Sequence, residues 1–343
     1  MEIQSIAGET DEICEKNRGL QYPKLGLQHP HGKQLGCGEQ GCVYDLEDNK
    51  VIKISESTSG WQEEVRIGKT LGDQGIGPII YDAFICNKKG FIVMEKLIDA
   101  KYGIREKLAD GHKEDHIEKM LLETQNQFIE QYKNMINWGY IHMDNHIENL
   151  GYVMRDGVSV PVLFDFGFTK EFKLSENDKR YALALCCFIT IEHQKLKTMA
   201  ETEFFQVGME SLFGAKEDRS PWQTSDLDGL TKGKTIEQLI FETGGAESSN
   251  IHIQKAALAY LYLLGLERVK RYNSPMYKSP MYVYIYEIRQ GNYDAPFPEQ
   301  RESRKKSVVP KIEPKKGRSM KKSMKKSGGR KHKRQKSKKK IRI

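Results

Sequence analysis

The sequence predicts an α+β protein in which a small β-rich part precedes a larger helical part and a basic tail. Three observations lead to this prediction. Short β-branched and aromatic runs dominate the first 100 residues, and helical periodicities dominate the next 200. From Glu299 onward there are no aromatic residues, and Lys, Arg, Ser and Gly prevail. The residues before this tail are enough to bury one two-lobed domain or two small ones.

The N-terminal region begins with an irregular segment and continues into a predicted β-hairpin. Residues 1–30 have no clear periodicity and are interpreted as an N-terminal extension. Further on, the runs CVYDL (42–46) and KVIKI (50–54) flank the turn-forming residues Glu47-Asp48-Asn49. Two strand-like runs separated by such residues predict antiparallel pairing.

One helix and two more strands are expected before residue 98. Val65, Ile67 and Leu71 approximate a single face of a helix over 61–71. The Gly-Pro pair at 77–78 interrupts the pattern, and apolar runs rich in Ile, Val and Phe follow it. These runs predict strands over 79–86 and 90–97.

Helical periodicity dominates the larger part of the chain. Apolar residues predict a long amphipathic helix over 115–138, and helical patterns return over 178–195 and 251–271. The longest apolar runs lie within the last two patterns and are well short of the roughly 20 residues that span a bilayer, so buried core helices are expected there. The polar, Gly-containing stretch 221–233 is expected to form loops.

The net charge of +8 is divided unevenly along the chain. The chain holds 55 Lys+Arg and 47 Asp+Glu, of which residues 301–343 hold 21 and 2. An acidic body with a net charge of −11 therefore carries a tail with a net charge of +19. The two parts are expected to have different roles.

The cysteines and the N-terminus indicate an intracellular protein. The six cysteines form no CxxC pair and no regular framework, so free thiols in a reducing compartment are expected. The N-terminus has neither the basic start nor the apolar stretch of a secretory signal. We therefore expect a soluble protein of the cytoplasm, the nucleus or both. The cysteines are Cys14, Cys37, Cys42, Cys86, Cys186 and Cys187.

The first chemical motif is a glycine-rich segment, Gly36-x-Gly38-x-x-Gly41-x-Val43. The spacing alone is weak evidence, because dinucleotide-binding folds also use it where glycines open a helix. Here the glycines lead into a predicted strand, a turn and another strand. Glycines suit a loop that covers nucleotide phosphates, since side chains would keep the backbone amides from the phosphate oxygens.

The second motif is a lysine followed by a helical carboxylate. Lys53 lies on the expected next strand, where an ammonium group can hold the α- and β-phosphates. Glu64 is the preferred partner because Ile67 and Leu71 follow at +3 and +7 on the same flank of the helix. Glu63 is the alternative.

The third motif is IHMDNHIENL (141–150), which follows the long helix and matches H-x-D-x-x-x-x-N. Asp165-Phe166-Gly167 comes after a strand-like VPVLF. Phosphoryl transfer needs a carboxylate that accepts the proton of the attacking hydroxyl, for which Asp144 is the candidate. It also needs oxygen ligands for Mg²⁺, for which Asn149 and Asp165 are the candidates.

These motifs, in this order, resemble those of the protein-kinase superfamily over residues 31–298. The resemblance implies a two-lobed fold with a β-rich N-lobe over 31–97 and a helical C-lobe over 98–298, and the composition of residues 299–343 predicts a disordered basic tail. It implies an enzyme that transfers the γ-phosphate of Mg-ATP to a hydroxyl, most simply of serine or threonine in a protein. The implied adenine pocket is lined by Val43, Met94 and Glu95 to Leu97.

The sequence departs from typical protein kinases in three places. Met143 stands where an Arg usually pairs with an activation-loop phosphate, which implies an enzyme that does not need that switch. His146 replaces the usual Lys near the γ-phosphate and resembles the loop H-x-D-x-H-x-x-N of aminoglycoside- and choline-kinase-like enzymes. Only 10 residues separate Gly167 from Asp178, too few for the usual peptide-binding segment. Asp178 itself resembles the aspartate that braces the catalytic loop.

The acceptor and the tail leave alternatives open. A small-molecule kinase is the second hypothesis, and a catalytically inactive kinase scaffold that binds nucleic acid is the third. Dense Lys and Arg in residues 301–343 can bind polyanions, direct nuclear import or only aid solubility. A compact kinase-like chain with such a tail is similar to kinase-like proteins of large DNA viruses. For a viral protein, the virion would be an alternative location.

Overall fold

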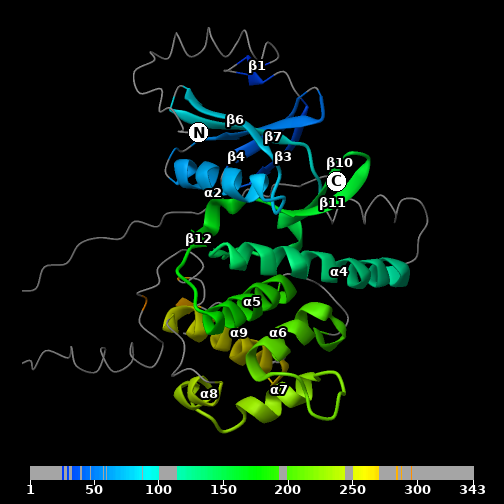
Figure 1. Cartoon of the computed structure of the whole chain (residues 1–343), viewed down its shortest axis with the longest axis vertical. Coiled ribbons are helices and arrows are strands. Elements are labelled where there is room, and N and C mark those ends of the chain that lie inside the picture. Colours follow the sequence, from blue (N-terminus) through cyan, green and yellow to red (C-terminus); the bar gives the residue numbers. More distant parts are fainter. Residues whose placement is uncertain are drawn as a thin grey trace, which may run out of the picture. The chain divides into compact units, whose positions relative to one another are not determined.

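The computed structural model describes most of the chain before residue 270 (Figure 1). The predicted tail over 299–343 and most of the predicted extension lie outside the described residues. Within the extension, only the strands β1 (Leu25–Gly26) and β2 (His29–Pro30), which pair with each other, are described. The described residues are 25–26, 29–30, 33–38, 41–46, 48–56, 58, 60–86, 88–99, 114–192, 199–243, 250–269, 283–284, 287 and 295.

The β-rich part is a five-stranded antiparallel sheet with the order β3-β4-β5-β7-β6. The predicted hairpin is confirmed, since β4 pairs with β5 and the turn residues Asp48 and Asn49 both have positive φ. The strands expected over 79–86 and 90–97 are confirmed as the pair β6 and β7. The bounds are β3 (Gln34–Gly38), β4 (Gly41–Asp45), β5 (Lys50–Ser55), β6 (Ile80–Cys86) and β7 (Lys89–Glu95).

Helix α2 (Trp61–Asp73) connects β5 to β6 and buries one face. The face predicted from Val65, Ile67 and Leu71 is confirmed, because all three are almost fully buried. Ile67 and Leu71 belong to the same hydrophobic cluster as Phe166 and the C-terminal helices. The helix therefore shares its core with segments about 100 residues later in the chain.

Two small sheets organise the segments that follow. Strand β9 (Tyr140–His142) pairs antiparallel with β12 (Thr169–Glu171), and Thr169 lies opposite His142. Strand β10 (Leu150–Arg155) forms a hairpin with β11 (Val158–Leu163) and also pairs with β8 (Ile98–Asp99). After β9 the chain thus forms the β10–β11 hairpin and then returns through β12 to pair with β9.

Six α-helices are described after residue 113, and together with the sheet they confirm the α+β class. Helix α5 packs against α4, α6 and α9, and Figure 1 shows these helices side by side. The apolar run 182–191 is almost entirely buried in α5, as predicted, and none of the described helices is long and apolar enough to cross a membrane. The helices are α4 (Glu114–Asn137), α5 (Glu176–Glu192), α6 (Glu203–Phe213), α7 (Thr224–Thr231), α8 (Ile236–Glu242) and α9 (Ile251–Val269).

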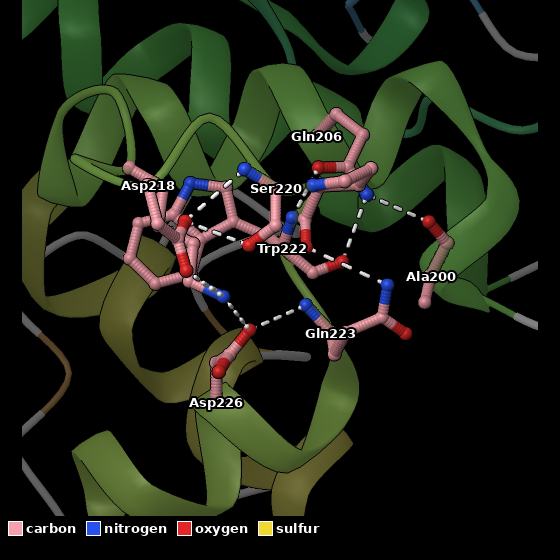
Figure 2. Close-up of polar contacts among 9 residues, drawn as sticks. Ala200, Gln206, Asp218, Ser220, Trp222, Gln223 and Asp226 are labelled. Atoms are coloured by element: carbon pink, nitrogen blue, oxygen red, sulfur yellow. Dashed lines mark hydrogen bonds and ion pairs between the residues drawn. The ribbon is translucent and has the colours of Figure 1, made fainter.

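The expectation of loops over 221–233 was wrong, because residues 224–231 form α7. Leu227 is fully buried against the main core, and the carboxylate of Asp226 accepts hydrogen bonds from Gln223 N (2.6 Å) and Lys216 Nζ (3.0 Å). Figure 2 shows how Gln206 of α6 brackets the preceding chain, with hydrogen bonds to both the N–H and the carbonyl of Trp222. Gln206 and Lys216 lie outside the helix, and a polar segment of eight residues is too short to show a clear helical period of its own.

The expectation of free thiols was wrong for three cysteines. Cys37 and Cys42 face each other across β3 and β4 and form a disulfide, and Cys86 is also disulfide-bonded. Only Cys186 and Cys187 are free among the described cysteines, and burial raises the pKa of Cys186 to about 12. Sequence spacing missed the first pair because the Cα atoms of Cys37 and Cys42 approach to 4.1 Å only once the hairpin forms.

Candidate active site

Lys53, in the middle of β5, pairs with two carboxylates that come from other parts of the chain. The Lys53 ammonium lies 2.6 Å from the Glu64 carboxylate of α2 and 2.8 Å from the carboxylate of Asp165. The lysine and Glu64 side chains are about 90% buried, whereas Asp165 is partly exposed. The sequence-predicted residues are thus brought together across 112 positions of chain.

The structure distinguishes the two candidate glutamates on α2. Glu64 faces Lys53, whereas Glu63 accepts two hydrogen bonds from Arg66 at the surface. Arg66 also donates to Glu171 of β12, at 2.8 Å. The expected pairing of Lys53 with Glu64 is therefore confirmed, because the helix turns the adjacent Glu63 toward the surface.

Two carboxylates control the charge of Lys53. Burial lowers the pKa of the lysine, but the charges and hydrogen bonds of Asp165 and Glu64 outweigh it, so the net pKa is raised. Lys53 is therefore a permanent cation near neutral pH. A buried, strongly perturbed ionisable group next to a partly exposed carboxylate marks a candidate functional site.

Asp165 has an unusual backbone conformation. Its φ and ψ are 58° and 62°, in the left-handed region that costs energy for a residue with a side chain. The next residue, Phe166, is buried under α2, and a Cβ on Gly77 would lie 2.8 Å from its ring. The absence of a side chain at Gly77 therefore lets the Phe166 ring, next to Asp165, pack close to the backbone there.

The loop after β9 carries Asp144 and is organised by a buried histidine. His142 is fully buried, and its Nδ1 accepts the N–H of Asp144 at 3.3 Å. Its Nε2 lies 2.9 Å from the Phe164 carbonyl, so Nε2 carries the proton of a neutral ring. Burial lowers the pKa of His142, which favours this neutral form. The imidazole therefore connects the Asp144 loop to the segment that precedes Asp165.

His146 lies beside the predicted catalytic carboxylate. Its Nε2 is 3.4 Å from Asp144 Oδ2, and both side chains are roughly one-fifth to one-quarter exposed. Met143, at the position where the resemblance implies an Arg, is buried in the core. An apolar side chain suits that buried position.

The two predicted metal ligands lie at the open end of the β10–β11 hairpin. Asn149 directly precedes β10, and the N–H of Phe164 donates to its carbonyl at 3.1 Å, next to Asp165. The amide nitrogen of Asn149 donates to the Asp144 carbonyl (2.8 Å), which leaves its amide oxygen for a cation. Within the described ranges there is no group of three or more His, Cys, Asp or Glu able to hold a metal. One carboxylate and one amide oxygen nevertheless fit Mg²⁺, which typically takes few protein ligands and completes its shell with phosphate and water.

The predicted nucleotide-contacting residues lie on the sheet. Gly36 and Gly38 lie on β3, and a Cβ added at either would meet nothing within 4 Å. Gly41 starts β4 with φ 140°, and a Cβ there would lie 2.2 Å from the Ile54 carbonyl oxygen, so only glycine fits. Val43 is paired with Lys53 in the sheet.

The segment predicted to line the adenine pocket lies at and just after the C-terminal end of β7. Met94 packs against the cluster of Trp61, Val65 and Ile92. Glu95 is buried, and its carboxylate binds Arg155 rather than facing outward. Leu97 lies just beyond the strand and is half-buried. Contacts of these residues with an adenine ring stay a prediction.

Asp178 has a structural role that the sequence did not indicate. It is fully buried and accepts hydrogen bonds from Ser175 N (2.9 Å) and from Asn250 N (2.8 Å). These bonds join the start of α5 to the start of α9. A brace from Asp178 to the Asp144 loop stays a prediction.

Two arginines near the site were missed from the sequence. Arg155 pairs with Glu95, and Arg66 pairs with Glu63 and Glu171. Arg66 carries a local signal, since it lies three positions after Glu63 on a helix. Arg155 carries none, because its partner is 60 positions away.

No protein-family model matches the chain, and no curated protein sequence matches it.

Proposed function

We propose that the chain is an ATP-dependent phosphotransferase with a two-lobed, protein-kinase-like fold. One observation carries the proposal: Lys53 bridges Glu64 and Asp165, at 2.6 Å and 2.8 Å, and hydrogen bonds connect Asp144 (through His142) and Asn149 to Phe164, the residue before Asp165. Single motifs of this kind arise by chance. Their convergence from β5, α2, the loop after β9 and the end of β11 supports a common chemical task.

Each side chain has a distinct role in the proposed reaction. Lys53, oriented by Glu64, binds and holds the nucleotide phosphates, while the glycines at 36, 38 and 41 let backbone N–H groups approach them. Asp165 and Asn149 would hold Mg²⁺, which supplies neutralisation of phosphate charge when bound. Asp144 orients the acceptor hydroxyl and accepts its proton. His146 donates a hydrogen bond to a phosphate oxygen.

Serine or threonine in a protein is the proposed acceptor. The glycine-rich hairpin and the segment from Met94 to Leu97 support a protein acceptor, since their amino-acid sequences resemble those of protein kinases more than those of small-molecule kinases. The test is transfer of labelled γ-phosphate from Mg-ATP to the protein itself and to generic basic and acidic proteins. Folded protein that binds Mg-ATP but transfers phosphate to no acceptor would contradict the proposal and favour an inactive scaffold.

A small-molecule acceptor is the second candidate, and a specific observation favours it. Strand β12 follows Phe168 directly and pairs with β9, and α5 begins at Glu176. Only four residues separate β12 from α5, so no extended platform for a peptide is built there. The discriminating assay compares ATP consumption with sugars, amino alcohols and aminoglycosides against consumption with protein acceptors. Turnover with only the small molecules would replace the first candidate by the second.

A further inference from the structure

Arg155 forms a buried ion pair at the closed end of the β10–β11 hairpin. Its Nε donates to Glu95 Oε1 at 3.1 Å and its Nη2 to Glu95 Oε2 at 2.7 Å, a bidentate arrangement. The Glu95 side chain is 7% exposed and that of Arg155 is 22% exposed. A pair of this geometry and burial is much more constraining than a surface ion pair.

The same two side chains also bind the segment that follows helix α2. Arg155 Nη2 donates to the Gly77 carbonyl at 2.9 Å, and the N–H of Ile79 donates to Glu95 Oε2 at 2.7 Å. Three separate segments, the end of β7, the residues after α2 and the tip of the hairpin, are therefore joined by two side chains.

The opposite end of the hairpin carries the predicted metal ligands. Leu150 lies opposite Leu163, so Asn149 and Asp165 flank the open end. The N–H of Leu163 donates to the Ile76 carbonyl at 2.9 Å, which ties this end to the same post-α2 segment. Arg155 and Leu163 thus attach both ends of the hairpin to residues 76–79.

We propose that Arg155 is a positioning residue that fixes Asn149 and Asp165 relative to the nucleotide-binding end of β7. The inference rests on the proposed function and adds a residue to it. Without Arg155 the hairpin keeps its backbone bond to Ile76 and its pairing with β8 but loses the side-chain anchor at its closed end, so the metal ligands change position relative to bound phosphates. The result is weaker use of Mg²⁺, while Asp144 and Lys53 remain intact.

The test uses the full chain with an Arg155→Met substitution, which keeps an apolar stem and removes every donor. The control is Arg180→Met, since Arg180 also donates to a backbone carbonyl, that of Ser211, but lies on the surface of α5. A fluorescent ATP analogue is titrated with and without Mg²⁺, and KM and kcat are measured as functions of Mg²⁺ concentration. Arg155→Met should raise the Mg²⁺ concentration for half-maximal binding about tenfold, as loss of a residue supporting metal ligands typically does. Analogue binding in EDTA and the control should change little.

Two further variants keep the inference open to contradiction if Arg155→Met does not fold. Arg155→Lys retains the positive charge on a single nitrogen, without the guanidinium fork, and should recover part of the Mg²⁺ dependence. Glu95→Gln removes the same ion pair from the other side, so combining it with Arg155→Lys should weaken Mg²⁺ use no further than the worse single variant. A lower melting temperature with unchanged Mg²⁺ dependence in the folded variants would show a merely structural tie and overturn the role of Arg155. Absence of Mg²⁺-dependent binding in the unmodified protein would instead overturn the proposed function, and this inference with it.

Discussion

Replacing Glu64 by Gln tests the charged centre of the site most directly, and the chain supplies its own matched control. Glu63 is the adjacent residue on the same helix, but it is half-exposed and pairs with Arg66. Glu63→Gln and Glu64→Gln are the same chemical change one position apart. Any difference between them reports the surroundings of the carboxylate and not the substitution.

The expected magnitude follows from burial and from the partners that remain. Removing one partner of a buried ion pair costs about 3–5 kcal/mol when it leaves a charge unpaired. Here Asp165 still lies 2.8 Å from Lys53 Nζ and is 37% exposed, so we expect a smaller loss of about 2 kcal/mol in the free energy of unfolding. The control should change that free energy by no more than about 0.5 kcal/mol. Because Lys53 loses its orientation, turnover should fall by up to about 100-fold in Glu64→Gln alone.

Two measurements check this prediction. Urea denaturation gives the free energy of unfolding of each variant, and labelled-phosphate transfer gives kcat and KM for ATP. Equal effects of the two substitutions on stability and turnover would show that the contact between Glu64 and Lys53 does not organise the site. Loss of stability in Glu64→Gln with full turnover would separate the contact from the proposed chemistry.

Four other expectations can be checked independently. Asp144→Asn should lower turnover by about 10²–10⁴-fold and leave ATP affinity unchanged, as compared by kinetics and direct binding; normal turnover would remove Asp144 from its role. Burial lowers the pKa of His142, so the unfolded chain binds a proton at a pH where the native chain does not, and the free energy of unfolding should decrease as the pH falls below about 6.5. Denaturation curves of His142→Gln should show a smaller decrease over the same pH range. Identical pH dependence of the two proteins would count against a neutral buried ring. Replacing both Cys37 and Cys42 by Ser should lower the free energy of unfolding by about 2 kcal/mol without reductant, and addition of a dithiol should abolish the difference between this variant and the unmodified hairpin. Deleting residues 299–343 should sharply reduce heparin and DNA binding and its salt dependence but leave ATP turnover intact, and retained DNA affinity would contradict the division of charge.

Much of the fold follows from local patterns. The hairpin around Asp48 and Asn49, the apolar face of α2 and the buried run in α5 are periodic over enough residues for the pattern to predict the element. Helix α7 does not follow, because its eight residues are stabilised by Gln206 and Lys216 of other segments. Short polar elements depend on contacts that have no period.

The candidate site was predictable as a set of residue types at characteristic spacings. Lys53, Asp144, Asn149 and Asp165 each lie in a motif whose chemistry can be read from the chain. Their distances could not be predicted, since an ion pair across 112 residues depends on how the core clusters pack. The buried link through His142 was likewise invisible, although the residue was part of the motif.

The sequence by itself determined the α+β class, the order of the longer helices and of the strands from β4 to β7, the division of charge between body and tail, and the chemical groups of the candidate site. These depend on side-chain type, local periodicity and turn chemistry, which act over a few residues. Only the tertiary structure decided that Glu64 faces Lys53, that Cys37 and Cys42 are bonded, and that Arg155 ties the hairpin to Glu95. Such contacts form between groups that are distant or oppositely directed along the chain, and burial of a shared core is what brings them together.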